Sequence, residues 1–226
     1  MPFPLRRTLD PATEPIDVVT MKNYLRVDIS DDDDLIGSLI SVARERAEDM
    51  TGMCLLPQQW TFSFDRFPRH CYESFAGLAT DRLYLHEHRR NSMFMHDGNA
   101  IILPRGPVQS VDSITYKDAF GDVQTLDPSR YQVDSLSSPA RINPVYGTTW
   151  PIALPDQNSI TVMFTAGCDS IPQSFIHAIK LIVGTYYENR AEVVQGSGNF
   201  NSLPLPLSAT SLLATYEMLK LGYPRS

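Results

Sequence analysis

The feature that most constrains this fold is the stretch of residues 30–52, SDDDDLIGSLISVARERAEDMTG. Its apolar residues recur at steps of three and four, which places them on one stripe of an α-helix. Ser30 is placed to cap the first turn, the aspartates after it suit the positive end of the helix dipole, and Gly52 is placed to end the helix. A helix of about 20 residues is about 30 Å long, so other elements must cover its stripe. The stripe consists of Leu35, Ile36, Leu39, Ile40, Ala43, Ala47 and Met50.

The charge balance excludes a general phosphate-binding surface. The 226 residues contain 19 Lys and Arg against 26 Asp and Glu, a net charge of -7, and 42% are hydrophobic, which is enough for a real core. Neither a membrane-spanning run nor a signal peptide is evident, so we expect a soluble, unexported, cytoplasmic protein without a membrane partner. Cys54, Cys71 and Cys168 lack CxxC spacing, which indicates reduced thiols and no zinc site.

Both ends of the chain supply candidate partners for the long helix. Residues 1–13, rich in proline, are predicted to form an extended arm, and residues 16–27 a short helix. Near the other end, a helix is expected from Ile171 to about residue 190, then a flexible loop over residues 191–206 and a last helix over residues 207–219. The predicted helical part therefore consists of residues 14–56 and 169–222.

Residues 57–168 read as an inserted β-rich region. Trp60, Phe62 and Phe64 alternate with polar residues, as a half-buried strand requires. Short strands divided by Pro, Asp and Gly predict a small antiparallel sandwich or barrel, so the fold class is α+β. Residues 66–99 fit this rhythm poorly and predict a protruding excursion hairpin. The other expected strands are 100–103, 108–117, 123–126, 131–134, 141–142 and 159–165.

Three groups of residues suggest chemistry or ligand binding, and a structural explanation is preferred for each. His86, His88 and His96 could bring imidazoles together around a metal, but exposed polar side chains on a contact hairpin are the simpler interpretation. The four aspartates lack the spacing of an EF-hand loop. We expect no enzyme, metal or cofactor. A set of aromatic residues could stack on bases or sugars, but we expect them to pack in the core instead. The set comprises Trp60, Phe62, Phe64, Tyr116, Tyr131, Trp150 and Phe164.

The order of segments carries more information than any single motif. LRVD stands before the acidic helix start, LPRGPVQSV opens the longest predicted strand, and YYENR precedes the flexible loop. In this order, over about residues 14–216, the chain resembles the head-tail connector (adaptor) proteins of long-tailed bacteriophages and related prophages. The excursion over residues 66–99 and the N-terminal arm depart from the family pattern.

The resemblance implies a structural virion protein in the neck between head and tail, present in the host cytoplasm before assembly. It implies a ring, usually twelve-fold, below the portal protein, with a docking surface for a stopper or tail-completion protein. Double-stranded DNA would pass through the ring without sequence recognition. The alternative is a virion-associated module that binds carbohydrate or a receptor through the β-rich region, and a metal-dependent hydrolase is the third hypothesis.

Two sets of residues are the predicted contact sites. The ring interface is expected on the long helix and the helix over residues 175–187, and comprises Asp33, Asp34, Arg44, Arg46, Tyr187 and Arg190. The excursion and the flexible loop are expected to contact the portal or the stopper. Their candidate residues are Tyr84, His86, His88, Arg89, Arg90, Phe94, His96, Val194, Phe200, Leu203 and Leu205.

Overall fold

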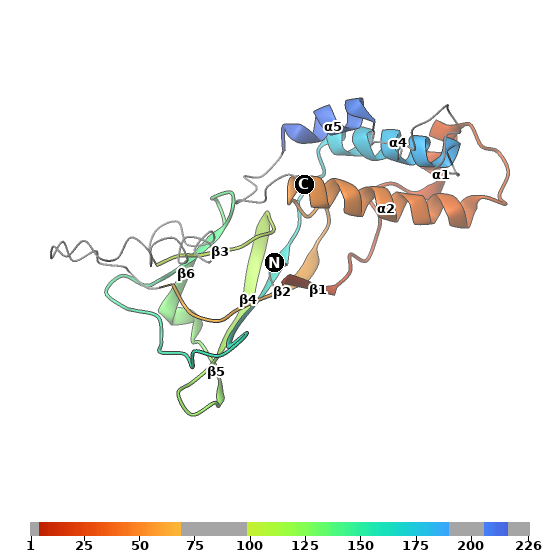
Figure 1. The fold of residues 1–226 in the computed structure, drawn as a ribbon. Helices are drawn as coiled ribbons and strands as arrows, with labels where there is room; N and C mark the ends of the chain where they lie inside the picture. The colour runs from red at the N-terminus through yellow and green to blue at the C-terminus, as the bar shows by residue number, and fades with distance from the viewer. Residues whose placement is uncertain (1–4, 69–98, 190–205, 217–226) are drawn as a thin grey trace, which may run out of the picture. The chain divides into compact units, whose positions relative to one another are not determined.

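The computed structural model describes residues 5–68, 99–189 and 206–216 (Figure 1). They fall into two compact units: a helical unit drawn from Pro11–Pro57 and Cys168–Met218, and a β-rich unit drawn from Met1–Asp10 and Gln58–Gly167. The fold class is α+β, and the described residues form four α-helices and two antiparallel sheets with no closed barrel. The excursion hairpin predicted over residues 66–99 lies mostly outside the described residues.

The helical unit is built on its longest helix, α2 (Asp33–Thr51). The helices α1 (Val18–Leu25), α4 (Gln173–Glu188) and α5 (Leu207–Ala214) complete it, and Figure 1 shows α4 and α5 running along α2. The predicted stripe of α2 faces this core at every position except Leu35, which confirms the amphipathic interpretation of the sequence. The buried core residues are Ile16, Met21, Ile36, Ile40, Ala43, Ala47, Leu55, Phe175, Ala178, Ile179, Ile182, Val183, Ala209 and Leu213.

Of the two caps predicted for α2, the one at its C-terminal end is confirmed and the one at its N-terminal end is wrong. Gly52 ends the helix in the left-handed conformation (φ 76°), and its N–H donates to the Glu48 carbonyl at 2.8 Å, as expected of a glycine cap. The cap assigned to Ser30 is wrong, because the N-cap position is Asp32. No side chain caps the helix there. The Asp32 carboxylate instead accepts a 2.6 Å hydrogen bond from the Tyr187 hydroxyl at the end of α4.

The larger sheet of the β-rich unit has the strand order β1–β2–β8–β4–β5, with every neighbouring pair antiparallel. One face is apolar, since Trp60 lies opposite Phe164 and Phe62 opposite Val162 in the pairing of β2 with β8. All four side chains are buried. The strands are β1 (Leu5–Leu9), β2 (Gln58–Phe64), β4 (Val108–Lys117), β5 (Val123–Thr125) and β8 (Ile160–Ala166).

The second sheet has the order β3–β7–β6, from β3 (Ile101–Ile102), β7 (Arg141–Pro144) and β6 (Tyr131–Asp134). The side chain of Asp134 holds the connection between β6 and β7 in place. Its carboxylate accepts hydrogen bonds from the Ser137 hydroxyl at 2.6 Å and from Arg141 Nε at 2.9 Å. These two donors lower the pKa of Asp134 to about 2, so the carboxylate stays ionised and the loop stays tied at neutral pH.

The N-terminal segment differs from the extended arm that was predicted from the sequence. Leu5–Leu9 is not an isolated extended segment but an edge strand, β1, paired with β2 through Leu5 opposite Phe62 and Arg7 opposite Trp60. The Thr8 and Thr61 hydroxyls add a hydrogen bond of 2.8 Å between the two strands. A strand of this length is stabilised by its neighbour and not by its own sequence, so proline content alone was a poor guide.

A buried network of charges joins three segments of the helical unit. Arg44 is 4% exposed, and it donates to Glu48 Oε2 at 3.0 Å and to Glu14 Oε2 at 2.8 Å. The other Glu48 oxygen accepts from the Leu55 N–H at 2.8 Å. Segment 11–17, helix α2 and the segment that follows α2 are therefore connected through one guanidinium group.

We predict that Arg44→Ala strongly destabilises the helical unit, because it removes the guanidinium group that pairs with the buried Glu48 carboxylate. Loss of one partner of a buried ion pair costs about 3–5 kcal/mol. Urea unfolding followed by circular dichroism at helical wavelengths measures the change in free energy of unfolding.

Arg46→Ala is the matched control, since Arg46 lies two residues away on the exposed face of the same helix. Its effect should stay within about 0.5 kcal/mol of wild type. Equal midpoints for the two variants would contradict the role given to Arg44.

Candidate interaction surfaces

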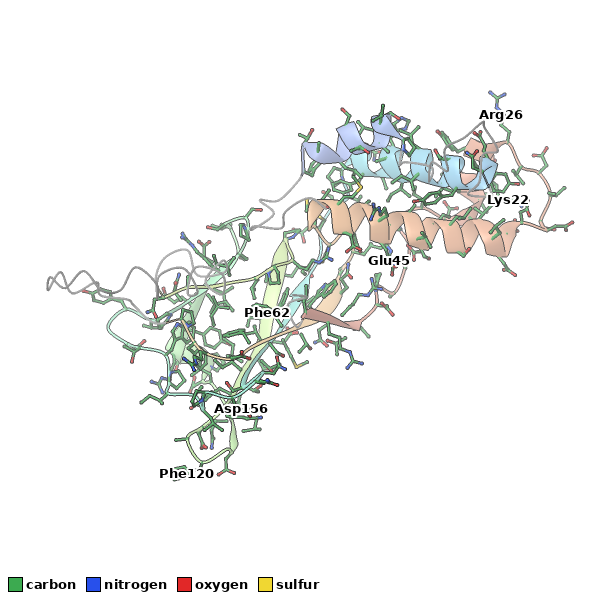
Figure 2. All side chains as sticks on the ribbon, viewed as in Figure 1. Lys22, Arg26, Glu45, Phe62, Phe120 and Asp156 are labelled. Carbon is green, nitrogen blue, oxygen red and sulfur yellow. The ribbon has the colours of Figure 1, made fainter. Side chains whose placement is uncertain are left out.

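The outer face of α2 is exposed and mainly acidic. Asp34, Glu45 and Asp49 contribute carboxylates, Arg46 contributes one guanidinium group, and Val42 is an exposed apolar residue among them. Figure 2 labels Glu45 on this helix. The face therefore combines charge of predominantly one sign with a small apolar contact, which suits a polar protein interface.

An aromatic cluster closes the base of the long excursion. The rings of Trp150 and Phe67 stack with centroids 5.0 Å apart, and Trp150 Nε1 donates to the Asn99 carbonyl at 2.7 Å. Phe67 also meets the rings of Phe64 and Tyr116 edge-on. Because Phe67 precedes residues 69–98 and Asn99 follows them, Trp150 ties both ends of that segment to the β-rich unit.

The loop between β4 and β5 carries large apolar side chains into solvent. Phe120 is 93% exposed and Val123 is 70% exposed. The loop itself is well ordered by Asp118, whose carboxylate accepts from the N–H groups of Phe120 and Asp122 at 2.9 and 3.1 Å. No functional residue was predicted here from the sequence. A phenylalanine inside the turn DAFGD is nevertheless unusual, because turns are mostly built from polar residues and glycine.

Residues 15–118 match the family model described as phage gp6-like head-tail connector protein. This segment contains α1, α2 and β2 to β4, that is, parts of both units and both ends of the excursion. Through this segment the chain is similar to the phage gp6-like head-tail connector family.

Solved structures resemble the chain over nearly its whole length. A chain from "Neck of empty GTA particle computed with C6 symmetry" has a TM-score of 0.67 at 17% identity, covering 98% of this chain and 99% of that one. A chain from "Virion of native gene transfer agent (GTA) particle" has a TM-score of 0.66 at 15% identity, covering 96% of each. A chain from "Neck of native GTA particle computed with C12 symmetry" has a TM-score of 0.60 at 16% identity, covering 97% and 100%. At these identities the likeness is one of fold, and no curated protein matches the chain.

The predicted ring-interface residues occupy different environments. Asp34 and Arg46 are exposed. Asp33 forms an ion pair with Lys22 at 2.6 Å, and Tyr187 donates to Asp32, so both are engaged within the helical unit. Arg44 is buried in the ion network, which removes it from the surface that a neighbouring subunit could contact. The sixth residue, Arg190, lies outside the described residues.

The predicted portal or stopper contacts all lie outside the described residues. This holds for Tyr84, His86, His88, Arg89, Arg90, Phe94 and His96 of the predicted excursion, and for Val194, Phe200, Leu203 and Leu205 of the segment before α5. Of these two regions, the structure describes the flanking residues alone. They therefore stay predictions.

The aromatic residues singled out from the sequence are mostly core residues, as predicted. Trp60, Phe62, Tyr131, Trp150 and Phe164 are buried, and Phe64 and Tyr116 are partly buried beside Phe67. This arrangement leaves the five buried rings unable to stack on a base or a sugar. Among the described residues, no helix has the length and apolarity needed to cross a membrane.

We predict that Trp150→Ala destabilises the β-rich unit by about 3 kcal/mol, because it removes the stacked ring and the donor to the Asn99 carbonyl. Trp150→Phe keeps an aromatic ring but loses the hydrogen bond, and should cost about 1–2 kcal/mol. Urea unfolding measures both values, and hydrogen exchange at residues 99–103 should rise in both variants. Tyr146→Ala, at a fully exposed aromatic residue of the same unit, is the control; a Trp150→Ala variant as stable as this control would refute the clamp.

Proposed function

We propose that this chain is a ring-forming connector subunit in the neck of a phage-like particle, below the portal protein. The observation that carries the proposal is the family match over residues 15–118, which includes α1, α2 and the residues on both sides of the excursion. The full-length likeness of fold to chains of gene transfer agent necks, computed with C6 and C12 symmetry, supports it. The ring would be twelve-fold and would receive a stopper or tail-completion protein on its other side.

The ring surface is proposed to include the exposed face of α2. A ring closes through heterologous contacts, in which one face of each subunit meets a different face of its neighbour. Asp34 and Arg46 are placed for such contacts, whereas Asp33 and Tyr187 support the same face from within by holding α1 and α4 against the start of α2. Arg44 is left out because it is buried.

The segments over residues 66–99 and 191–206 are proposed to contact the portal or the stopper. The aromatic clamp at Trp150 supports this assignment for the first segment, because it fixes both ends of the excursion on the β-rich unit. A long insertion that is anchored at its base and extends the family pattern is suited to partner recognition.

The DNA is proposed to pass through the ring without being bound. The net charge of -7 per subunit gives an assembled ring a large negative charge, which would repel the phosphates during passage. Carbohydrate binding is less well supported, because five of the seven aromatic residues that it would need are buried.

We predict that the purified protein forms a ring-sized species, alone or on the cognate portal. Light scattering at several concentrations, with and without portal, measures the mass, and a twelve-fold ring would have about twelve times the 25.4 kDa of one chain. Charge reversal at two exposed positions of α2, Asp34→Lys with Arg46→Glu, should reduce the ring fraction without changing the melting temperature. A strict monomer that ignores the portal would contradict the proposed function.

We predict that deletion of residues 86–96 leaves a folded subunit that cannot complete particles. The deletion spares the Phe67, Asn99 and Trp150 clamp, so the β-rich unit keeps its base. Circular dichroism and the melting temperature report on folding, and electron microscopy of particles counts heads with attached tails. Normal, fully tailed particles would show that the excursion is not a partner contact.

A further inference from the structure

The loop between β4 and β5 presents an apolar knob that the fold itself does not explain. Phe120 and Val123 lie on it, and Ile152 on a neighbouring segment is 78% exposed. That segment is held beside β4, because the Leu154 N–H donates to the Lys117 carbonyl at 2.9 Å. Figure 2 shows Phe120 at the end of its loop, away from Phe62 in the sheet. None of the three side chains contributes to the core of the β-rich unit.

The loop holds Phe120 in place before any partner arrives. The Gln124 amide donates to Asp118 Oδ2 at 3.0 Å, the N–H groups of Phe120 and Asp122 donate to Oδ1, and Gly121 takes the positive φ of 91° that the turn requires. The Asp118 N–H also donates to the Asp122 carbonyl at 2.9 Å. A loop ordered in this way loses little conformational entropy on binding, which favours its use as an anchor.

The loop that carries Phe120 is acidic. Asp118 and Asp122 flank Phe120 in the sequence, and Asp156 on the neighbouring segment forms an ion pair with Lys117 of β4, with Oδ2 3.1 Å from Nζ. The hydrogen bond from Gln124 lowers the pKa of Asp118, and the hydrogen bond from Lys117 lowers the pKa of Asp156. Both groups are therefore ionised at neutral pH. The surface that fits this tip is an apolar cavity with a basic rim.

We propose that the β4–β5 tip docks into an apolar pocket, rimmed by Lys or Arg side chains, on a different protein of the neck. The proposal rests on the proposed connector function and adds to it a contact independent of the excursion and of the loop before α5. Phe120 fills the pocket, Val123 and Ile152 border it, and the three carboxylates face the basic rim. An exposed aromatic anchor with an apolar border and a charged rim is the arrangement found at binding hot spots.

Assembly in the producing cell tests the proposal with matched variants. Phe120→Ala should reduce the number of DNA-filled heads with attached tails about tenfold or more, because truncation of a hot-spot aromatic residue weakens binding by at least that factor. Asp122→Lys should reduce it as well, through repulsion from the basic rim. Leu136→Ala is the control, since Leu136 is a 98% exposed apolar residue on another loop of the same unit. The purified Phe120→Ala protein should melt at the wild-type temperature, which separates a lost contact from a lost fold.

A photocrosslinker identifies what the tip meets. Benzoylphenylalanine is placed at position 120, or at position 136 as the control, and crosslinked peptides from assembled particles are identified by mass spectrometry. A crosslink from position 120 to a pocket with Lys or Arg at its rim, on another particle protein, supports the proposal. A crosslink only to further copies of this chain, or Phe120→Ala particles as complete as those of Leu136→Ala, overturns it. Absence of the wild-type chain from particles would instead overturn the connector function itself.

Discussion

The buried guanidinium group of Arg44 is the interaction on which the helical unit depends. It lies on the apolar side of α2, where an unpaired charge would be very unfavourable, and it is balanced by two glutamates. Glu48 in turn accepts the Leu55 N–H, and the Cys168 thiol donates to the Cys54 carbonyl at 3.4 Å. The chain crosses from one unit to the other near residues 10, 57 and 167. On the helical side of each crossing, a nearby residue forms one of these hydrogen bonds: Glu14, Leu55 and Cys168. We infer that this network fixes the ends of the segments that lead out of the helical unit.

The acidic character of the chain has two separate causes. Asp118, Asp127 and Asp134 each accept N–H groups from residues two or more positions ahead, so they order turns in a region of short strands. Their charge follows from a structural role. Asp34, Glu45 and Asp49 lie instead on the exposed face of α2. The second group therefore places part of the net charge on the surface of the helical unit.

Periodicity made most of the fold predictable from the sequence. The three- and four-residue spacing gave α2 and its buried stripe, and alternation gave β2. Turn residues on either side of short segments gave β4 and β6, both with the bounds found in the structure. The failures share one physical reason, which is that a distant partner decided the outcome. Leu5–Leu9 is a strand because β2 pairs with it, and Asp32 replaced Ser30 at the cap while accepting from Tyr187, a residue 155 positions away.

The candidate site was less predictable, because a contact surface depends on exposure and not on residue type. Arg44 follows Ile36 and Ile40 at four-residue steps, so its position on the stripe indicated burial, but its charge led to a surface assignment. Phe120 is the opposite case: its type indicated the core, whereas the turn around it leads away from the core. Before assembly an exposed aromatic ring is a risk for aggregation, and the carboxylates of Asp118, Asp122 and Asp156 reduce that risk by repelling other acidic copies of the chain. The same charges favour a basic partner. The carboxylates near Phe120 therefore disfavour association between copies of the chain and favour binding to a basic pocket.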